Sequence, residues 1–127
     1  MKKEDFKDKI VIVTGGAQGI GRCIAEEFQK AGATVCVIDK QQGNHFVGDL
    51  ADKQVLEEFV REVIGKYGHV DCLINNALPL MKGIDECSYE EFQYALSVGV
   101  TAPFYLAKLL CSIFRRGGSH REHLLIS

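Results

Sequence analysis

The chain has 127 residues, of which 46% are hydrophobic and 25% charged, and its formal net charge is -2. This size and balance fit one folded core, so we predict a single domain over residues 1–127. The small negative charge argues against nucleic-acid binding. We expect no apolar run of membrane-spanning length and no secretory signal at the charged start, and therefore a cytoplasmic location.

Five cysteines and four histidines are scattered along the chain. No Cys-x-x-Cys pair occurs, and the histidines lack the spacing of metal ligands. Because a free cysteine packs as a small hydrophobe, we expect buried or half-buried thiols and no metal site.

Short β-branched runs alternate with longer helical patterns, which is typical of βαβ units on a parallel sheet. The pattern predicts an α/β fold with strands at 10–14, 34–39, 45–47, 70–75 and 123–126. Helices are expected at about 20–30 and 53–66, the second one behind Asp52 as its N-cap. The first helix is expected to pack on the sheet through Ile20, Cys23, Ile24 and Phe28.

Two further helices are expected before the last strand. The capping box Ser88-x-x-Glu91 predicts the start of the third helix, with Phe92 and Leu96 turned inward. A glycine and a proline, Gly99 and Pro103, interrupt the following apolar pattern, so the fourth helix is expected at about 100–115.

A glycine-rich turn, Thr14-Gly15-Gly16-Ala17-Gln18-Gly19-Ile20-Gly21, follows the first strand and opens the first helix. The first backbone N–H groups of a helix lack partners and lie at the positive end of its dipole, so a pyrophosphate can bind there. Glycines let the backbone approach it closely. The turn lacks the Gly-Lys-Ser/Thr ending of a P-loop and therefore indicates a dinucleotide site.

Acidic residues follow the second and third predicted strands. Asp39 can accept both ribose hydroxyls of a dinucleotide and would repel the extra phosphate of NADP, which favours NAD, whereas Lys40 is able to recruit that phosphate. Asp49 can accept the adenine amino group while Leu50 covers the ring. The alternatives are a solvated turn residue at Asp39 and a turn before the next helix at Asp49.

Amides follow the fourth strand in Asn75-Asn76-Ala77, where the strand order is expected to reverse. Polar amides at such a point fix loop backbone or contact a ligand ribose, and both roles can hold together.

Together these motifs resemble the short-chain dehydrogenase/reductase family, whose glycine motif is Thr-Gly-x-x-x-Gly-x-Gly and whose fourth strand ends in Asn-Asn-Ala-Gly. The resemblance implies a Rossmann-type doubly wound parallel sheet of about five strands, truncated after the fifth. It implies an NAD(P)-dependent oxidoreductase acting on a small alcohol or carbonyl compound. The implied cofactor contacts are Gly15, Gln18, Gly19, Ile20, Gly21, Asp39, Lys40, Asp49, Leu50, Asn76, Ala77 and Val98.

The catalytic Tyr-x-x-x-Lys of that family does not occur in these 127 residues. The family's helix asparagine aligns with Gly99, and Leu78 replaces the last glycine of Asn-Asn-Ala-Gly. Ser127 falls at the substrate-serine position, with an ordinary C-terminal serine as the alternative. We therefore expect an inactive cofactor-binding half of an NAD-dependent oxidoreductase, or alternatively a non-catalytic NAD-binding or subunit-interaction module.

A sheet that stops at the fifth strand is expected to leave a bare edge, and exposed edges pair with other chains. We predict self-association through this edge or through the apolar residues of the fourth helix, Phe104, Leu106, Leu109, Leu110 and Ile113.

Overall fold

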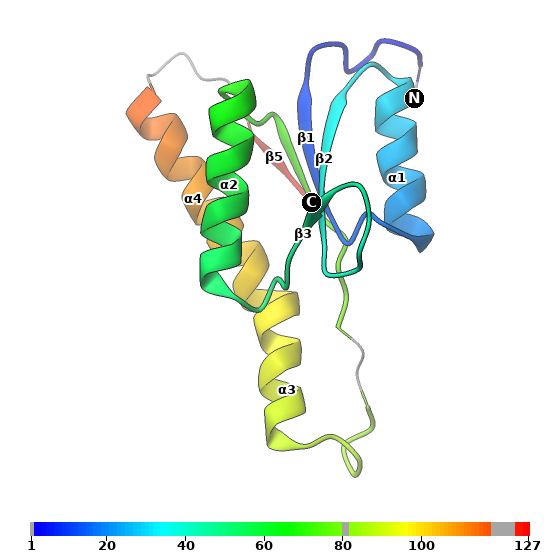
Figure 1. The fold of residues 1–127 in the computed structure, drawn as a ribbon, viewed down its shortest axis with the longest axis vertical. Coiled ribbons are helices and arrows are strands. Elements are labelled where there is room, and N and C mark those ends of the chain that lie inside the picture. Colours follow the sequence, from blue (N-terminus) through cyan, green and yellow to red (C-terminus); the bar gives the residue numbers. More distant parts are fainter. Residues whose placement is uncertain (1, 80–81, 118–123) are drawn as a thin grey trace.

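In a computed structural model, which describes residues 2–79, 82–117 and 124–127, the strands form one parallel sheet in the order β3-β2-β1-β4-β5 (Figure 1). The order reverses between β1 and β4, and ligands bind at such a switch point, beyond the carboxyl ends of the strands. The predicted Rossmann-type sheet is confirmed. Its strands are β1 (Ile10–Thr14), β2 (Thr34–Asp39), β3 (Phe46–Val47), β4 (Cys72–Asn75) and β5 (Leu125–Ile126).

The last three strands are shorter than predicted. Only Phe46 and Val47 pair with β2 as β3, and β4 begins at Cys72 rather than at residue 70. The predicted start of β5 at residue 123 lies outside the described residues, and the strand that is described forms one edge of the sheet.

Helices cover both faces of the sheet (Figure 1). The helix α1 (Gly19–Lys30) lies on one face, and α2 (Lys53–Tyr67) and α4 (Ala102–Gly117) lie on the other. Side chains alternate along β1, so that Ile10 and Ile12 pack towards α2 and α4 while Val11 and Val13 pack towards α1. This alternation gives the sheet two cores and fixes the carboxyl end of β1 between them.

Local signals set the helix ends as predicted. The Asp52 carboxylate accepts a hydrogen bond from the Gln54 backbone N–H at 2.9 Å, and α2 stops where Gly68 takes a φ of +83°. The helix α3 (Tyr89–Leu96) begins at the complete Ser88–Glu91 capping box.

The predicted inward face of α1 is partly wrong. Ile20 is 76% exposed and Cys23 is also exposed, so the expectation of a buried or half-buried thiol fails at Cys23. The buried residues of α1 are the small Gly21 and Ala25, with Ile24 packed beside them. Small side chains let the helix lie close to the sheet, which turns the larger neighbours outward.

The third and fourth helices are one continuous helix, not two. They are joined by the π-helical turn η1 (Ser97–Thr101), in which the Ala102 N–H bonds to the Ser97 carbonyl. Pro103 has no N–H and cannot continue an ordinary helical hydrogen-bond ladder, and a wider turn accommodates it.

The helix α3 extends beyond the carboxyl edge of the sheet (Figure 1). The prediction that Phe92 and Leu96 face inward is therefore wrong, because they lie past the sheet and are 46% and 39% exposed. In contrast, Leu106 and Leu110 of α4 are fully buried and unavailable for the contacts predicted between chains.

The segment Tyr89–Ile113, at 25 residues, is long and apolar enough to cross a membrane by length and composition. The expectation that no segment reaches this length is therefore wrong. A single helix of this kind is weak evidence for a membrane span, and its residues Ala102, Leu106 and Leu110 belong to the core between the sheet and α2.

Replacing Leu106 by alanine should lower the free energy of unfolding by about 2–5 kcal/mol, because it leaves a cavity in the core. The matched control is Phe104→Ala on the same helix, where the side chain is 62% exposed. Urea unfolding followed by circular dichroism measures both. Equal effects of the two substitutions would contradict the assigned faces of α4.

Candidate functional site

The glycine turn folds tightly against the end of β4. Gly15 and Gly19 have φ values of +65° and +60°, a region that favours glycine. A Cβ added to Gly15 would lie 3.0 Å from the Ala77 Cα, and one added to Gly21 would lie 2.2 Å from the Gly15 carbonyl oxygen. Side chains at these positions would separate β1, α1 and the end of β4.

Hydrogen bonds hold the same three elements together. The Thr14 Oγ1 atom is buried and accepts the backbone N–H groups of Asn76 and Ala77, both at 3.1 Å. The Asn76 side-chain amide donates to the Gly15 carbonyl at 3.1 Å. Asn76 therefore fixes loop backbone, as one of its two predicted roles requires, and Thr14 is a site residue that the sequence analysis did not single out.

The N-terminus of α1 is free to bind an anion. Its N-cap residue Gln18 makes no side-chain cap hydrogen bond, and its first turn contains no acidic residue. A Cβ added to Gly19 would meet no atom within 4 Å, so open space adjoins the turn. A pyrophosphate fits this combination of free N–H groups, helix dipole and space.

Asp39 lies beside the glycine turn, at the end of β2. Its Oδ2 atom accepts the Ala17 backbone N–H at 3.1 Å, and its Oδ1 atom accepts the Gln41 N–H at 3.0 Å. Each carboxylate oxygen can accept a further donor. The half-buried Asp39 thus orders the turn and retains acceptor capacity for a ligand.

Asp49, Lys40 and Tyr94 form a cluster that joins the loops after β2 and β3 to α3. The Tyr94 hydroxyl lies 3.0 Å from both carboxylate oxygens of Asp49, and the Ala51 N–H donates to Asp49 Oδ1 at 2.9 Å. The Lys40 Nζ atom lies 3.4 Å from the same hydroxyl and 5.4 Å from the centre of the Tyr94 ring. Partial burial, followed by the bond to Asp49, raises the pKa of Tyr94 above its usual value and keeps the hydroxyl a donor.

Ser127 continues the pairing of β5 with β4 at the carboxyl edge. Its N–H donates to the Leu73 carbonyl at 2.9 Å, and its carbonyl accepts the Asn75 N–H at 2.6 Å. The Asn75 Oδ1 atom next to it is buried and lacks a hydrogen-bond partner among the described residues. A buried acceptor without a donor is costly, so a donor group that reached this atom would stabilise this end of β4.

The remaining predicted positions differ in exposure. Leu50 and Val98 are 7% and 8% exposed and pack in the core, so their predicted cofactor contacts stay predictions. Leu78 is 85% exposed beyond Ala77. A Cβ at Gly99 would lie 3.4 Å from the Pro79 Cδ atom, so the backbone leaves space for a Cβ where the family has its asparagine.

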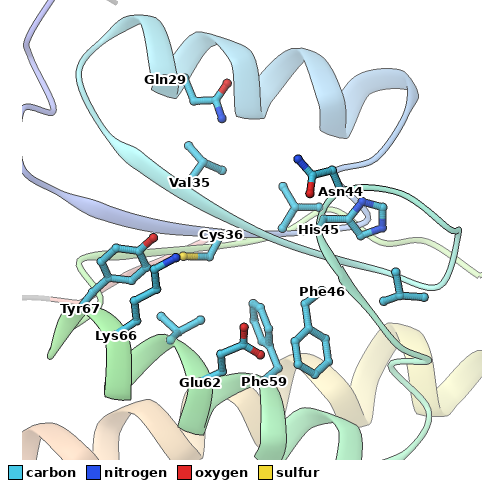
Figure 2. Close-up of a pocket in the computed structure, with 13 residues that line it drawn as sticks. Gln29, Val35, Cys36, Asn44, His45, Phe46, Phe59, Glu62, Lys66 and Tyr67 are labelled. Atoms are coloured by element: carbon cyan, nitrogen blue, oxygen red, sulfur yellow. The ribbon is translucent and has the colours of Figure 1, made fainter.

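An open cavity of about 650 Å³ lies away from the glycine turn, between α1, the outer side of β2 and α2 (Figure 2). β3 pairs only with the end of β2, and no other described strand covers the rest of that edge of β2. The cavity forms along this uncovered part of the strand. None of the predicted site residues lines it; its walls include Val35, Cys36, Phe46, Phe59 and Lys66. Burial raises the pKa of Cys36 to about 11, so its thiol stays neutral and unreactive at pH 7.

Within the described parts of the chain, no group of three or more His, Cys, Asp or Glu side chains converges on a point that could hold a metal ion.

The profile of the short chain dehydrogenase family matches residues 9–120 of the chain. The chain belongs to this family. The matched range includes the glycine turn, Asp39, Asp49 and Asn75-Asn76-Ala77.

Curated and solved short-chain dehydrogenases extend this result. The L-fucose dehydrogenase of Mus musculus is 32% identical over 87% of this chain and 46% of its own length. A short-chain oxidoreductase from Clostridium thermocellum is 35% identical, with a TM-score of 0.76, over 91% of this chain and 51% of its own. The 3-ketoacyl-(acyl-carrier-protein) reductase of Brucella melitensis, solved with NADH, has a TM-score of 0.85 over 96% of this chain and 56% of its own at 23% identity, which shows the shared fold. The chain thus spans about half the length of the relatives it matches.

Replacing Gly21 by alanine should lower the free energy of unfolding by about 1–3 kcal/mol, because the added methyl overlaps the Gly15 carbonyl and the Asn76 amide. Gly65→Ala is the matched control, since a Cβ there meets no atom within 4 Å and alanine favours the helix by about 0.5–1 kcal/mol. Urea midpoints of the two variants should move in opposite directions. A Gly21→Ala protein as stable as the unmodified chain would contradict the described packing.

Proposed function

We propose that this chain binds NAD(H) in the crevice between β1 and β4, as the dinucleotide-binding half of a short-chain oxidoreductase. The observation that carries the proposal is the open, uncapped start of α1, with the Asp39 carboxylate bonded to the glycine turn beside it. In this arrangement the N–H groups of the glycine turn bind the pyrophosphate, Asp39 accepts the ribose hydroxyls, and Asp49 accepts the adenine amino group.

The charges in the crevice favour NAD over NADP. The Asp39 carboxylate stands where a 2′-phosphate would add negative charge and would repel it. Lys40 is the base best placed to offset that repulsion, but its ammonium group is engaged by the Tyr94 hydroxyl and ring. The bound dinucleotide would supply a hydride donor or acceptor for an alcohol or carbonyl substrate.

Catalysis needs a proton donor or acceptor within hydrogen-bond reach of the reacting oxygen. The Tyr-x-x-x-Lys that serves this purpose in the family does not occur in these 127 residues. Ser127, at the end of β5, remains the residue that we assign to substrate positioning. We infer that these residues bind the cofactor without turnover, and that the whole short-chain oxidoreductase acts on an alcohol or carbonyl compound.

Titration of the chain with NADH and NADPH, followed by calorimetry, should give tighter binding of NADH. Asp39→Asn keeps an acceptor for the Ala17 N–H but removes the charge. It should therefore reduce the ratio of the NADPH and NADH dissociation constants by about tenfold. Asp85→Asn, in an exposed loop, is the control and should change neither affinity. Preferred binding of NADPH by the unmodified chain would overturn the role given to Asp39.

A second candidate function is interaction between subunits, supported by an exposed apolar stripe on the outer side of α3, η1 and α4. Large side chains recur at helical spacing and are 39–62% exposed at Phe92, Leu96, Val100 and Phe104. Contiguous exposed apolar surface on a soluble protein marks an interaction site. The edge strand β5, with Leu125 and Ile126 also exposed, offers a second surface. We propose that the chain self-associates through the helical stripe.

Sedimentation velocity should show a mass that increases with protein concentration. Val100→Lys, in the middle of the stripe, should shift the equilibrium to the monomer because it places a charge in the apolar contact. Ile84→Lys is the control, since Ile84 is 95% exposed in a loop outside the stripe. A monomer at all concentrations for the unmodified chain would exclude this interaction.

A further inference from the structure

Lys40, Asp49 and Tyr94 form a hydrogen-bonded cluster at the proposed adenine end of the site, and the proposed function gives Tyr94 no contact with the dinucleotide. These residues come from three separate parts of the chain: Lys40 follows β2, Asp49 follows β3, and Tyr94 lies on α3. They meet because α3 extends past the carboxyl edge of the sheet (Figure 1). We call this group the clasp.

The Tyr94 hydroxyl occupies the central position in front of the Asp49 carboxylate. It lies 3.0 Å from each of the two oxygens, whereas a donor bound to one oxygen alone would lie closer to that one. The only other described bond to this carboxylate comes from the Ala51 N–H and uses Oδ1. An external amino group that approached Asp49 would therefore meet the hydroxyl in the position that it needs.

The Lys40 ammonium holds the tyrosine from the other side. It lies 3.4 Å from the hydroxyl oxygen and within cation–π distance of the ring, at 5.4 Å. Tyr94 is only 36% exposed, so the two contacts hold a side chain that is already partly covered. The hydroxyl donates to Asp49 and accepts from Lys40, and this satisfies both of its hydrogen-bonding functions without a ligand.

We propose that Tyr94 is an internal competitor for the adenine subsite, and that its hydroxyl competes with the amino group of an adenine nucleotide for the position in front of the Asp49 carboxylate. Adenine binding at Asp49 is itself proposed above, so this inference rests on that function. The clasp then sets the affinity of the chain for dinucleotides, because the apparent dissociation constant is the intrinsic one divided by the fraction of molecules with an open clasp.

The test compares NADH binding by the unmodified chain and by Tyr94→Phe, which keeps the ring over Lys40 and removes the hydroxyl. We expect Tyr94→Phe to bind NADH about threefold to tenfold more tightly, the effect of removing one exposed charge-assisted hydrogen bond from the free state. Tyr89→Phe is the matched control, because Tyr89 lies on the same helix, is 75% exposed, and makes no hydrogen bond through its hydroxyl to another described residue. It should bind NADH as the unmodified chain does.

Two further binding measurements test whether the competition takes place at Asp49. In an Asp49→Asn background the gain from Tyr94→Phe should shrink, because the charged acceptor for which hydroxyl and amino group compete is gone. Tyr94→Phe should raise the affinity for reduced nicotinamide hypoxanthine dinucleotide, which lacks the amino group, by a smaller factor than the affinity for NADH.

The outcomes separate the two proposals. If the unmodified chain binds NADH and Tyr94→Phe binds it equally or more weakly, the competitor role is overturned while the dinucleotide site stands. If neither protein binds NADH, both proposals fail. If only Tyr94→Phe binds NADH, the clasp is closed strongly enough to block the site, which supports both proposals.

Discussion

The fold and the candidate site depend on one close contact, between the start of α1 and the carboxyl ends of β1 and β4. Gly21 has no side chain, and a Cβ there would lie 2.2 Å from the Gly15 carbonyl oxygen and 2.3 Å from Asn76 Nδ2. Because the helix lies this close, its free N–H groups open directly onto the switch point of the sheet. The amide of Asn76 then bonds the glycine turn, so that strand, turn and helix hold one geometry.

The sheet and the glycine turn could be predicted because both depend on local pattern. The β-branched run along 10–14 and the cap at Asp52 act over a few residues, and the structure has the strand and the cap where the sequence indicates. The inward faces of α1 and α3 could not be predicted in the same way. An apolar pattern identifies a helix face but not what lies opposite it. In α1 the small Gly21 is buried against the sheet while Ile20 is exposed, and in α3 Phe92 lies beyond the end of the sheet.

The clasp lay outside the reach of sequence reasoning for a related physical reason. Lys40 and Asp49 follow strands and were identified as candidate ligand contacts, whereas Tyr94 gave no signal because its position depends on the length and direction of a helix. That direction is set by the π turn at Ser97–Thr101, which carries one helix past Pro103 without a break. In the proposed site, the carboxylate assigned to adenine already has a donor in the Tyr94 hydroxyl.

In the proposed function the dinucleotide binds at the glycine turn and not in the cavity beside Cys36 (Figure 2). The most direct measurement is a two-dimensional ¹H–¹⁵N NMR spectrum of the chain during titration with NADH. Binding at the glycine turn should shift the signals of the backbone amides of Gly15, Gly19 and Asp49 together. An unchanged spectrum, or shifts confined to the surroundings of Cys36 and Phe46, would contradict it.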